Sequence, residues 1–259
     1  MIKVGIAAAT GRMGALIRQE IAKDSRFQLV AGTTSLSNPK LGEMIDSNVR
    51  LTADAESLFS GTDLVIDFST LDLLGKHIGL AIQKNVSLVI GTTGASVYQK
   101  EEIKKASKTI PILYASNTSM GVTIMKSLIT QVAKLLGVEF DIEIDEIHHR
   151  HKVDAPSGTS LSLGEAAAKG RGVNLQDVAC YTRHGHTGPR SQGQIGFSVR
   201  RGGSVVGEHT VSFLGDDEAL EITHKGFSRS LYAKGALQAA RWLYGKPAGL
   251  YTMEDVLGL

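Results

Sequence analysis

The chain has 259 residues, of which 42% are hydrophobic and 21% are charged, and these fractions are ordinary for a soluble globular protein. Its net charge of +2 is too small for a general nucleic-acid-binding surface, so we predict no nucleic-acid partner. The single cysteine, Cys180, excludes an intrachain disulfide framework and a cysteine-based zinc cluster. The sequence shows neither a signal-peptide pattern nor an apolar run long enough to span a bilayer, so we expect a cytoplasmic protein with no membrane partner.

The first 136 residues alternate short apolar runs with amphipathic stretches. This rhythm is typical of parallel strands joined by crossover helices, and it predicts a Rossmann-type doubly wound parallel sheet. The expected strands are Ile2–Ala8, Gln28–Thr33, Leu64–Phe68, Val86–Ile90 and Ile110–Tyr114. The expected helices are Met13–Lys23, Leu71–Lys84, Ser96–Ser107 and Met120–Leu136.

The pattern changes in the second half of the chain. Apolar residues alternate with acidic ones over 140–145, which predicts a strand with one apolar and one acidic face whose alternation stops at Glu146. A helix is expected over 157–168. Renewed alternation with glycine turns over 194–224 predicts hairpins of a mostly antiparallel sheet, one of them turning at Arg201–Ser204.

These patterns predict an α/β protein with two domains. Residues 1–118 plus 229–259 are expected to form the dinucleotide-binding domain, with the helix predicted at 229–244 packed back onto it. Residues 119–228 are expected to form an α+β domain.

A glycine-rich turn, residues 8–14, follows the first strand. Gly11 would let a pyrophosphate approach the backbone, and Gly14 would let the helix pack closely on the strand. The helix N-terminus adds free N–H groups and a partial positive charge. Ala8 stands in place of the first glycine of the usual fingerprint, so tight packing between strand and helix is the alternative interpretation.

Three further turns follow apolar strands and precede helices, at 67–70, 91–94 and 115–118. Ligands of doubly wound sheets bind at the carboxyl ends of strands, where small and hydroxyl side chains would suit a nicotinamide ring. The same residue types are also the preferred helix caps, so the two interpretations stand together.

The second strand ends at Thr33 without the acidic residue that usually binds the adenosine ribose. A 2′-phosphate would therefore not be repelled, and Thr34, Ser35, Arg12 or Lys40 could hydrogen-bond it. An uncharged loop that discriminates poorly explains the sequence equally well. We therefore predict NADPH or NADH as the cofactor.

Residues 146–159 place three histidines, an arginine and a lysine directly before a Pro-Ser-Gly-Thr turn. Imidazole titrates near neutral pH and can donate a proton, while the basic side chains and the N–H groups after the turn favour a carboxylate or phosphate. The segment therefore predicts a proton donor beside an anion-binding site, with a solvated basic loop as the alternative.

The motifs together resemble the 4-hydroxy-tetrahydrodipicolinate reductase (dihydrodipicolinate reductase) family over nearly the whole chain. The run from His148 to Thr159 is the most specific part of this resemblance. The segments that carry it are Gly11–Gly14, Gly91–Gly94, Ser116-Asn117, Glu146–Thr159, Gly185–Gly188 and Gly207–Thr210.

The resemblance implies an oxidoreductase of lysine and diaminopimelate biosynthesis that reduces a cyclic imine dicarboxylate to tetrahydrodipicolinate. In the family, hydride passes from the nicotinamide to ring C4, and a histidine protonates the neighbouring carbon. By motif position His148 is the general acid, and Lys152 holds a substrate carboxylate and polarises the developing charge. His149, Ser157, Gly158 and Thr159 would complete the dicarboxylate pocket. The resemblance further implies that residues 119–228 serve substrate binding and oligomerisation, and that the protein is a homotetramer.

The cofactor-binding set expected from the turns and the resemblance contains one residue outside the sheet edge, Arg229, for which a solvated helix start is the alternative. The set comprises Ala8, Gly11, Arg12, Met13, Gly14, Thr34, Phe68, Gly91, Thr92, Thr93, Ala115, Ser116, Asn117 and Arg229. Ala8 and Thr34 depart from the family pattern, which leaves the choice of cofactor open but does not affect the reaction.

Three other functions compete with the reductase. Another two-domain NAD(P)-dependent dehydrogenase would not explain the whole 146–159 run, and a non-catalytic dinucleotide sensor would not need an acid beside an anion site. A zinc site on His148, His149 and His151 is disfavoured because adjacent strand residues point in opposite directions and Lys152 would repel a cation. We therefore predict no metal.

Overall fold

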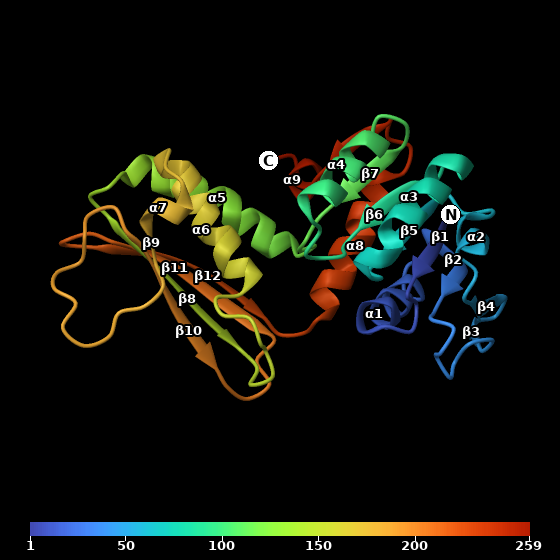
Figure 1. Cartoon of the computed structure of the whole chain (residues 1–259), viewed down its shortest axis with the longest axis horizontal. Coiled ribbons are helices and arrows are strands. Elements are labelled where there is room, and N and C mark those ends of the chain that lie inside the picture. The colour runs from blue at the N-terminus through green and yellow to red at the C-terminus, as the bar shows by residue number, and fades with distance from the viewer. The chain divides into compact units, whose positions relative to one another are not determined.

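The computed structural model describes all residues from Met1 to Leu259, and these divide into two compact units (Figure 1). Unit 1 consists of Met1–Met120 together with Ser230–Leu259, and unit 2 consists of Gly121–Arg229. The sequence placed the boundaries after residues 118 and 228, within two residues of these positions. No helix in either unit combines the length and the apolar character that crossing a bilayer requires.

Unit 1 is built on an eight-stranded sheet with the order β13-β7-β6-β5-β1-β2-β4-β3. Every strand pair in it is parallel except β3 with β4. The strands are β1 (Ile2–Ala7), β2 (Phe27–Thr33), β3 (Met44–Asp46), β4 (Val49–Thr52), β5 (Leu64–Asp67), β6 (Ser87–Ile90), β7 (Pro111–Tyr114) and β13 (Gly249–Tyr251). The five predicted strands are all present, with ends within one residue of those expected.

Helices cover both faces of this sheet, because alternate residues of one strand belong to different hydrophobic clusters. Leu64 and Ile66 of β5 pack with α1, α8 and α9, whereas Val65 packs with α2, α3 and α4. The predicted Rossmann-type doubly wound sheet is therefore confirmed. The helices are α1 (Arg12–Ile21), α2 (Ala55–Phe59), α3 (Leu71–Lys84), α4 (Val97–Ala106), α8 (Ser230–Leu243) and α9 (Met253–Leu257).

The C-terminal residues complete unit 1. Helix α8 packs against α1 and buries Leu237 and Leu243 in the same cluster as the central strands. Its Gly235 lies against the backbone that follows β7, where an added Cβ would be 1.7 Å from the carbonyl oxygen of Thr118. The Thr118 hydroxyl also donates a hydrogen bond of 2.8 Å to the carbonyl oxygen of Tyr232. The chain thus leaves unit 1 after β7 and closes it again with α8.

Unit 2 contains a five-stranded sheet with the order β12-β11-β8-β10-β9, and one face of it packs against helices α5 and α6 (Figure 1). Its core includes Ile144 and Phe213 from the sheet and Leu163 from α6. The strands are β8 (Asp141–His148), β9 (Ala179–Cys180), β10 (Ile195–Arg201), β11 (Gly207–Leu214) and β12 (Ala219–Gly226). The helices are α5 (Met120–Leu136), α6 (Gly158–Arg171) and α7 (Leu175–Val178).

The predicted hairpin at Arg201–Ser204 is wrong, because β8 lies between β10 and β11. Strand β10 runs parallel to β8 and β9, whereas β11 runs antiparallel to β8 and β12. The glycine-rich segment instead crosses the end of β8, where the Gly202 N–H donates to the His148 carbonyl and the His149 N–H donates to the Val205 carbonyl. The sheet of unit 2 is therefore mixed rather than mostly antiparallel.

Strand β8 continues to His148, three residues beyond the alternation of apolar and acidic residues over 140–145. Its buried residues are Ile142, Ile144, Glu146 and His148, at every second position. The two polar side chains therefore extend the core face of the sheet and do not belong to the loop that follows. This register determines the geometry of the site in unit 2.

Candidate active site

The turn between β1 and α1 has the close backbone approach that a dinucleotide requires. A Cβ at Gly14 would lie 2.3 Å from the carbonyl oxygen of Ala8 and 2.7 Å from the Cα of Ala9, so only glycine fits. Gly11 is the N-cap of α1 and offers no capping side chain, which leaves the first N–H groups of the helix available to an anion. These residues fit a bound pyrophosphate.

Ala8 adopts a left-handed conformation with φ 55°. Such a conformation costs an alanine about 1–2 kcal/mol, and glycine adopts it freely at the expense of about 0.5–1 kcal/mol of chain entropy. Ala8→Gly should therefore raise the free energy of unfolding by about 0.5–1 kcal/mol, measured by thermal or denaturant unfolding. Ala22→Gly is the matched control, because exposed Ala22 has φ −60° and the change should destabilise. Equal effects of the two changes would contradict the prediction.

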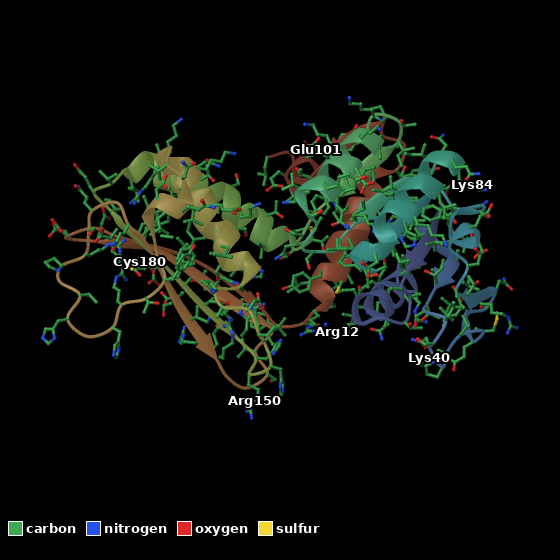
Figure 2. All side chains as sticks on the ribbon, viewed as in Figure 1. Arg12, Lys40, Lys84, Glu101, Arg150 and Cys180 are labelled. Carbon is green, nitrogen blue, oxygen red and sulfur yellow. The ribbon has the colours of Figure 1, made fainter.

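A cavity of about 300 Å³ lies beside this turn and contains no acidic side chain in its lining. Lys76 of α3 contributes the cation, whereas Arg12 and Lys40, both labelled in Figure 2, are outside the lining. The hydroxyl of Thr34 is already hydrogen-bonded to that of Thr10 at 2.6 Å. The lining residues are Ala8, Thr33, Thr34, Ser35, Ala53, Ala55, Phe68, Ser69, Thr70, Leu73, Lys76 and His77.

The predicted turns after β5, β6 and β7 meet at one edge of the sheet, because these strands are neighbours. Phe68 lies directly over Gly91, where a Cβ would be 2.2 Å from its ring. The Ala115 N–H donates to the carbonyl of Ile90, and Thr92 is buried. Thr93 and Ser116 are exposed at the same edge. The structure thus brings together the parts of the cofactor set that lie far apart in the sequence.

A buried, hydrogen-bonded aspartate–histidine pair fixes the turn after β5. Asp67 and His77 are at most 2% exposed, and Oδ2 of Asp67 lies 2.6 Å from Nδ1 of His77. The other carboxylate oxygen accepts a hydrogen bond from the Ser69 N–H. Burial alone would raise the pKa of Asp67, but the contact with His77 and the Ser69 hydrogen bonds outweigh it and lower the pKa. The pair anchors α3, and with it Lys76, to the sheet edge.

In unit 2, the end of β8 holds a carboxylate with three partners. Glu146 is 1% exposed, and its Oε1 accepts hydrogen bonds from the Ser157 N–H (2.7 Å) and from Nη2 of Arg201 (3.1 Å). Its Oε2 lies 2.5 Å from Nδ1 of His148. Burial would raise the pKa of Glu146, but these partners outweigh it and hold the pKa at about 2. Glu146 is therefore ionised at neutral pH.

His209 of β11 completes the buried polar group. It lies opposite Glu146 in the strand register, and its ring meets that of His148 edge-on with 5.1 Å between centroids. Burial lowers the pKa of His209 to about 4, with the charge of His148 acting in the same direction, so His209 is neutral at pH 7. Ser157, predicted to bind substrate, is 1% exposed and caps α6 by accepting a hydrogen bond from the Ser160 N–H.

The basic residues around this group have partners of their own. Nζ of Lys152 lies 2.7 and 2.9 Å from the two carboxylate oxygens of Asp154. Arg229, which the sequence predicts to bind the cofactor, is the last residue of unit 2, and its guanidinium lies 3.2 Å from Nε2 of His149. Gly158 and Thr159 form the first turn of α6.

The three histidines of the 148–151 run do not converge on one point. His148 faces the core, and His149 and His151 have ring centroids 6.2 Å apart, beside the exposed Arg150 at the tip of the turn (Figure 2). Glu146, His148 and His209 bring ligand-type atoms within 4.8 Å of one another. However, the 2.5 Å between Glu146 and His148 is a hydrogen-bond distance, shorter than the spacing of about 3.3 Å expected for two ligands of one tetrahedral zinc. The geometry favours a shared proton.

Comparison with known proteins assigns both units. The family model described as dihydrodipicolinate reductase, N-terminus, matches residues 2–118, and the model described as dihydrodipicolinate reductase, C-terminus, matches residues 121–257. The chain belongs to the dihydrodipicolinate reductase family. Among the relatives of this reductase family, 4-hydroxy-tetrahydrodipicolinate reductase of Burkholderia ambifaria (strain MC40-6) is 46% identical and each chain is covered completely.

Other members of the dihydrodipicolinate reductase family agree with this match. The 4-hydroxy-tetrahydrodipicolinate reductase of Acinetobacter baumannii (strain AYE) is 45% identical, with 99% of this chain and 96% of the relative covered. A solved structure of dipicolinate-bound dihydrodipicolinate reductase from Paenisporosarcina sp. TG-14 superimposes with a TM-score of 0.80 at 23% identity, covering 98% of each chain. That likeness confirms the fold.

For this member of the dihydrodipicolinate reductase family, sequence reasoning overlooked the partners of the residues it named. Glu146 was seen only as the start of the basic run and Arg201 as a turn residue, and His209 was included only within the Gly207–Thr210 segment. Lys76 and His77 carry no local motif. Strand pairing and helix packing bring these residues to the sites, and the one available sequence signal was the spacing of two between Glu146 and His148.

Proposed function

We propose that this chain catalyses the NAD(P)H-dependent reduction of 4-hydroxy-tetrahydrodipicolinate to tetrahydrodipicolinate in lysine and diaminopimelate biosynthesis. The observation that carries the proposal is a histidine paired with a buried carboxylate, in a chain that is 46% identical over its whole length to a reductase of this name. The small cyclic dicarboxylate substrate, the homotetrameric assembly and the cytoplasmic location expected from the sequence are parts of the same proposal.

Unit 1 binds and orients the dinucleotide, which supplies the hydride when bound. The uncapped N-terminus of α1 takes the pyrophosphate, and the cavity beside Ala8 takes the adenosine end. The turns that carry Thr92 and Asn117 lie at the carboxyl edge where the nicotinamide would sit. These residues position the cofactor and perform no proton transfer.

Unit 2 supplies the proton. Hydride addition to the conjugated imine leaves an electron-rich ring carbon, and protonated His148 transfers its Nε2 proton to that carbon while the N–H electron pair stays on Nε2. The hydroxylated substrate loses water in the same overall reaction. His148 then regains a proton from solvent.

The substrate carboxylates are held by cations and by the start of a helix. Gly158 and Thr159 present the N-terminal end of the 14-residue helix α6, which carries a partial positive charge. Lys152 exchanges Asp154 for a substrate carboxylate and stabilises the negative charge that develops in the transition state. Nε2 of His149, on the same loop, accepts a hydrogen bond from Nη2 of Arg229, whose remaining N–H groups add donors beside it.

A coupled assay tests the reaction. Substrate generated by the synthase that condenses pyruvate with aspartate semialdehyde is mixed with purified protein and NADPH or NADH, and the nicotinamide absorbance is followed. We expect rapid substrate-dependent oxidation. If neither NADPH nor NADH is oxidised while mass spectrometry detects the substrate, the proposed function is wrong. That result would favour another dehydrogenase or a dinucleotide sensor.

The cavity in unit 1 further suggests a preference for NADPH. It has no acidic side chain to repel a 2′-phosphate, and exposed Lys76 lines it together with Ser35 without forming a salt bridge. Lys76 therefore supplies the positive charge near the 2′-phosphate for which the sequence analysis named Arg12 or Lys40. We infer that the 2′-phosphate binds at Lys76.

Lys76→Ala should weaken NADPH binding about 10-fold and leave NADH binding nearly unchanged, because only NADPH carries the 2′-phosphate. Dissociation constants are measured by nicotinamide fluorescence without substrate. Lys84→Ala, on the same helix but paired with Glu56 at 3.4 Å, is the control and should affect neither cofactor. Equal loss of both cofactors, or of neither, would rule out Lys76 as the phosphate ligand.

A further inference from the structure

Glu146 divides its two oxygens between two tasks. Oε1 is held by the Ser157 N–H and by Arg201, and Oε2 faces Nδ1 of His148. Because both donors to Oε1 are fixed N–H groups, the carboxylate cannot rotate without losing them. Oε2 is thereby aimed at one nitrogen of one imidazole.

The surroundings leave the opposite side of the imidazole open. Nδ1 of His148 is sealed from solvent, although 9% of the side-chain surface remains exposed. Across the sheet, Gly207 of β11 has no side chain, and a Cβ there would lie 2.9 Å from Nε2 of His148. Nε2 therefore faces the space that the missing side chain of Gly207 leaves.

We propose that Glu146 is a positioning residue, which with Arg201 fixes one proton of His148 on Nδ1 and reserves Nε2 for the proton delivered to the substrate. This proposal rests on the reductase function proposed above. The proposal gives Glu146 and Arg201 a role in the reaction, although neither residue is among those proposed to contact the substrate.

The positions of the two imidazole hydrogens during the reaction explain why a carboxylate is required beside Nδ1 of His148. Protonated His148 carries hydrogens on both nitrogens, and Nδ1 lies 2.5 Å from Oε2 of Glu146, so its hydrogen lies toward the carboxylate. When the Nε2 hydrogen leaves, its electron pair stays on Nε2 and the neutral ring keeps the Nδ1 hydrogen. Without an acceptor at Nδ1, the neutral ring could hold its hydrogen on Nε2. Nε2 would then have no free electron pair with which to accept the next proton from solvent.

The charges around the pair are balanced by residues on every neighbouring strand. Arg201 of β10 offsets the charge of Glu146, and His209 of β11 is neutral at pH 7. Lys152 and Asp154 of the loop are paired with each other, and His224 of β12 lies beyond His209. When His148 is protonated, it and Arg201 therefore share the single negative charge of Glu146.

A purely structural role for Glu146 would be to tie the loop to the sheet through Ser157. That structural role requires an acceptor at Oε1. It does not depend on which nitrogen of His148 carries a hydrogen. Glu146→Gln separates the two roles, because the amide oxygen can still accept from Ser157 and Arg201 while the amide NH₂ replaces Oε2. The NH₂ group donates to Nδ1 and forces the neutral hydrogen onto Nε2.

Nitrogen NMR of the full-length protein with labelled histidine reads the tautomer without substrate or turnover. Spectra are recorded from about pH 5 to about pH 9, and the His148 signals are assigned from their loss in His148→Asn. In the wild type we expect neutral His148 to carry its hydrogen on Nδ1. A wild-type ring with its hydrogen on Nε2 overturns the proposal even if every variant fails to fold.

Kinetics of Glu146→Gln complete the test. We expect the neutral tautomer to switch to Nε2–H and kcat to fall about 100-fold or more with little change in KM, as when a triad carboxylate is replaced by its amide. Asp145→Asn, one residue earlier on the opposite face of β8, should leave tautomer and kcat unchanged. Wild-type kcat in Glu146→Gln overturns the proposal. An Nδ1–H tautomer in a protein without reductase activity would overturn the proposed function and leave the Glu146–His148 pairing intact.

Discussion

Replacement of His148 by glutamine should lower kcat by about 10²- to 10⁴-fold and change KM far less, because a positioned general acid contributes that factor to the chemical step and little to binding. His148 is the buried imidazole whose Nδ1 is held by Glu146, and no other histidine of unit 2 is placed to substitute for it. His209 is neutral at pH 7, since its pKa is about 4. His149 lies against Arg229.

Steady-state kinetics with synthase-generated substrate measure this effect. His186→Gln is the control, because His186 is exposed in a loop of unit 2 and should retain wild-type kinetics. A thermal melt verifies that His148→Gln is folded. Wild-type kcat in a folded His148→Gln protein would remove this residue from the mechanism.

Gly14→Ala should abolish dinucleotide binding and destabilise unit 1 by about 2–4 kcal/mol. The added methyl would lie 2.3 Å from the Ala8 carbonyl oxygen and 2.7 Å from the Ala9 Cα, and both are backbone atoms that cannot rotate away. The turn must therefore open, which moves the N-terminus of α1 away from the pyrophosphate position.

The measurements are cofactor fluorescence titration and denaturant unfolding. Gly75→Ala is the matched control, because this exposed helical glycine has no atom within 4 Å of an added Cβ. It should stabilise α3 by up to about 1 kcal/mol and leave cofactor affinity intact. Tight NADPH binding by Gly14→Ala would show that the turn does not hold the pyrophosphate.

Local periodicity was sufficient to predict the strands and long helices of unit 1, because each element buries a face that the sequence marks with apolar residues. Short elements such as α2 and β13 were missed, since they span at most five residues and show no period. In unit 2 the same reasoning placed a hairpin at Arg201–Ser204, where β8 actually separates the strands. Adjacency along the chain suggested a pairing that the sheet order contradicts.

The candidate sites divide in the same way. Gly11, Gly14 and His148 belong to local motifs and could be named from the sequence. Lys76 reaches the cavity only because α3 packs beside β5, and Arg201 reaches Glu146 only because β10 pairs with β8. Such partners depend on long-range pairing, which a single sequence does not encode in any spacing.

The late return of the chain to unit 1 has a consequence for biosynthesis. The contact between Gly235 and Thr118 cannot form until residues 121–229 have left the ribosome, which takes about 5–20 s at bacterial elongation rates. During that interval the surface of the sheet that α8 will cover, with Leu64 and Ile66 on it, remains available to chaperones and to other nascent chains. Unit 2 emerges as a continuous segment and can fold first, so the nascent protein acquires its proton donor before its nucleotide-binding unit is closed.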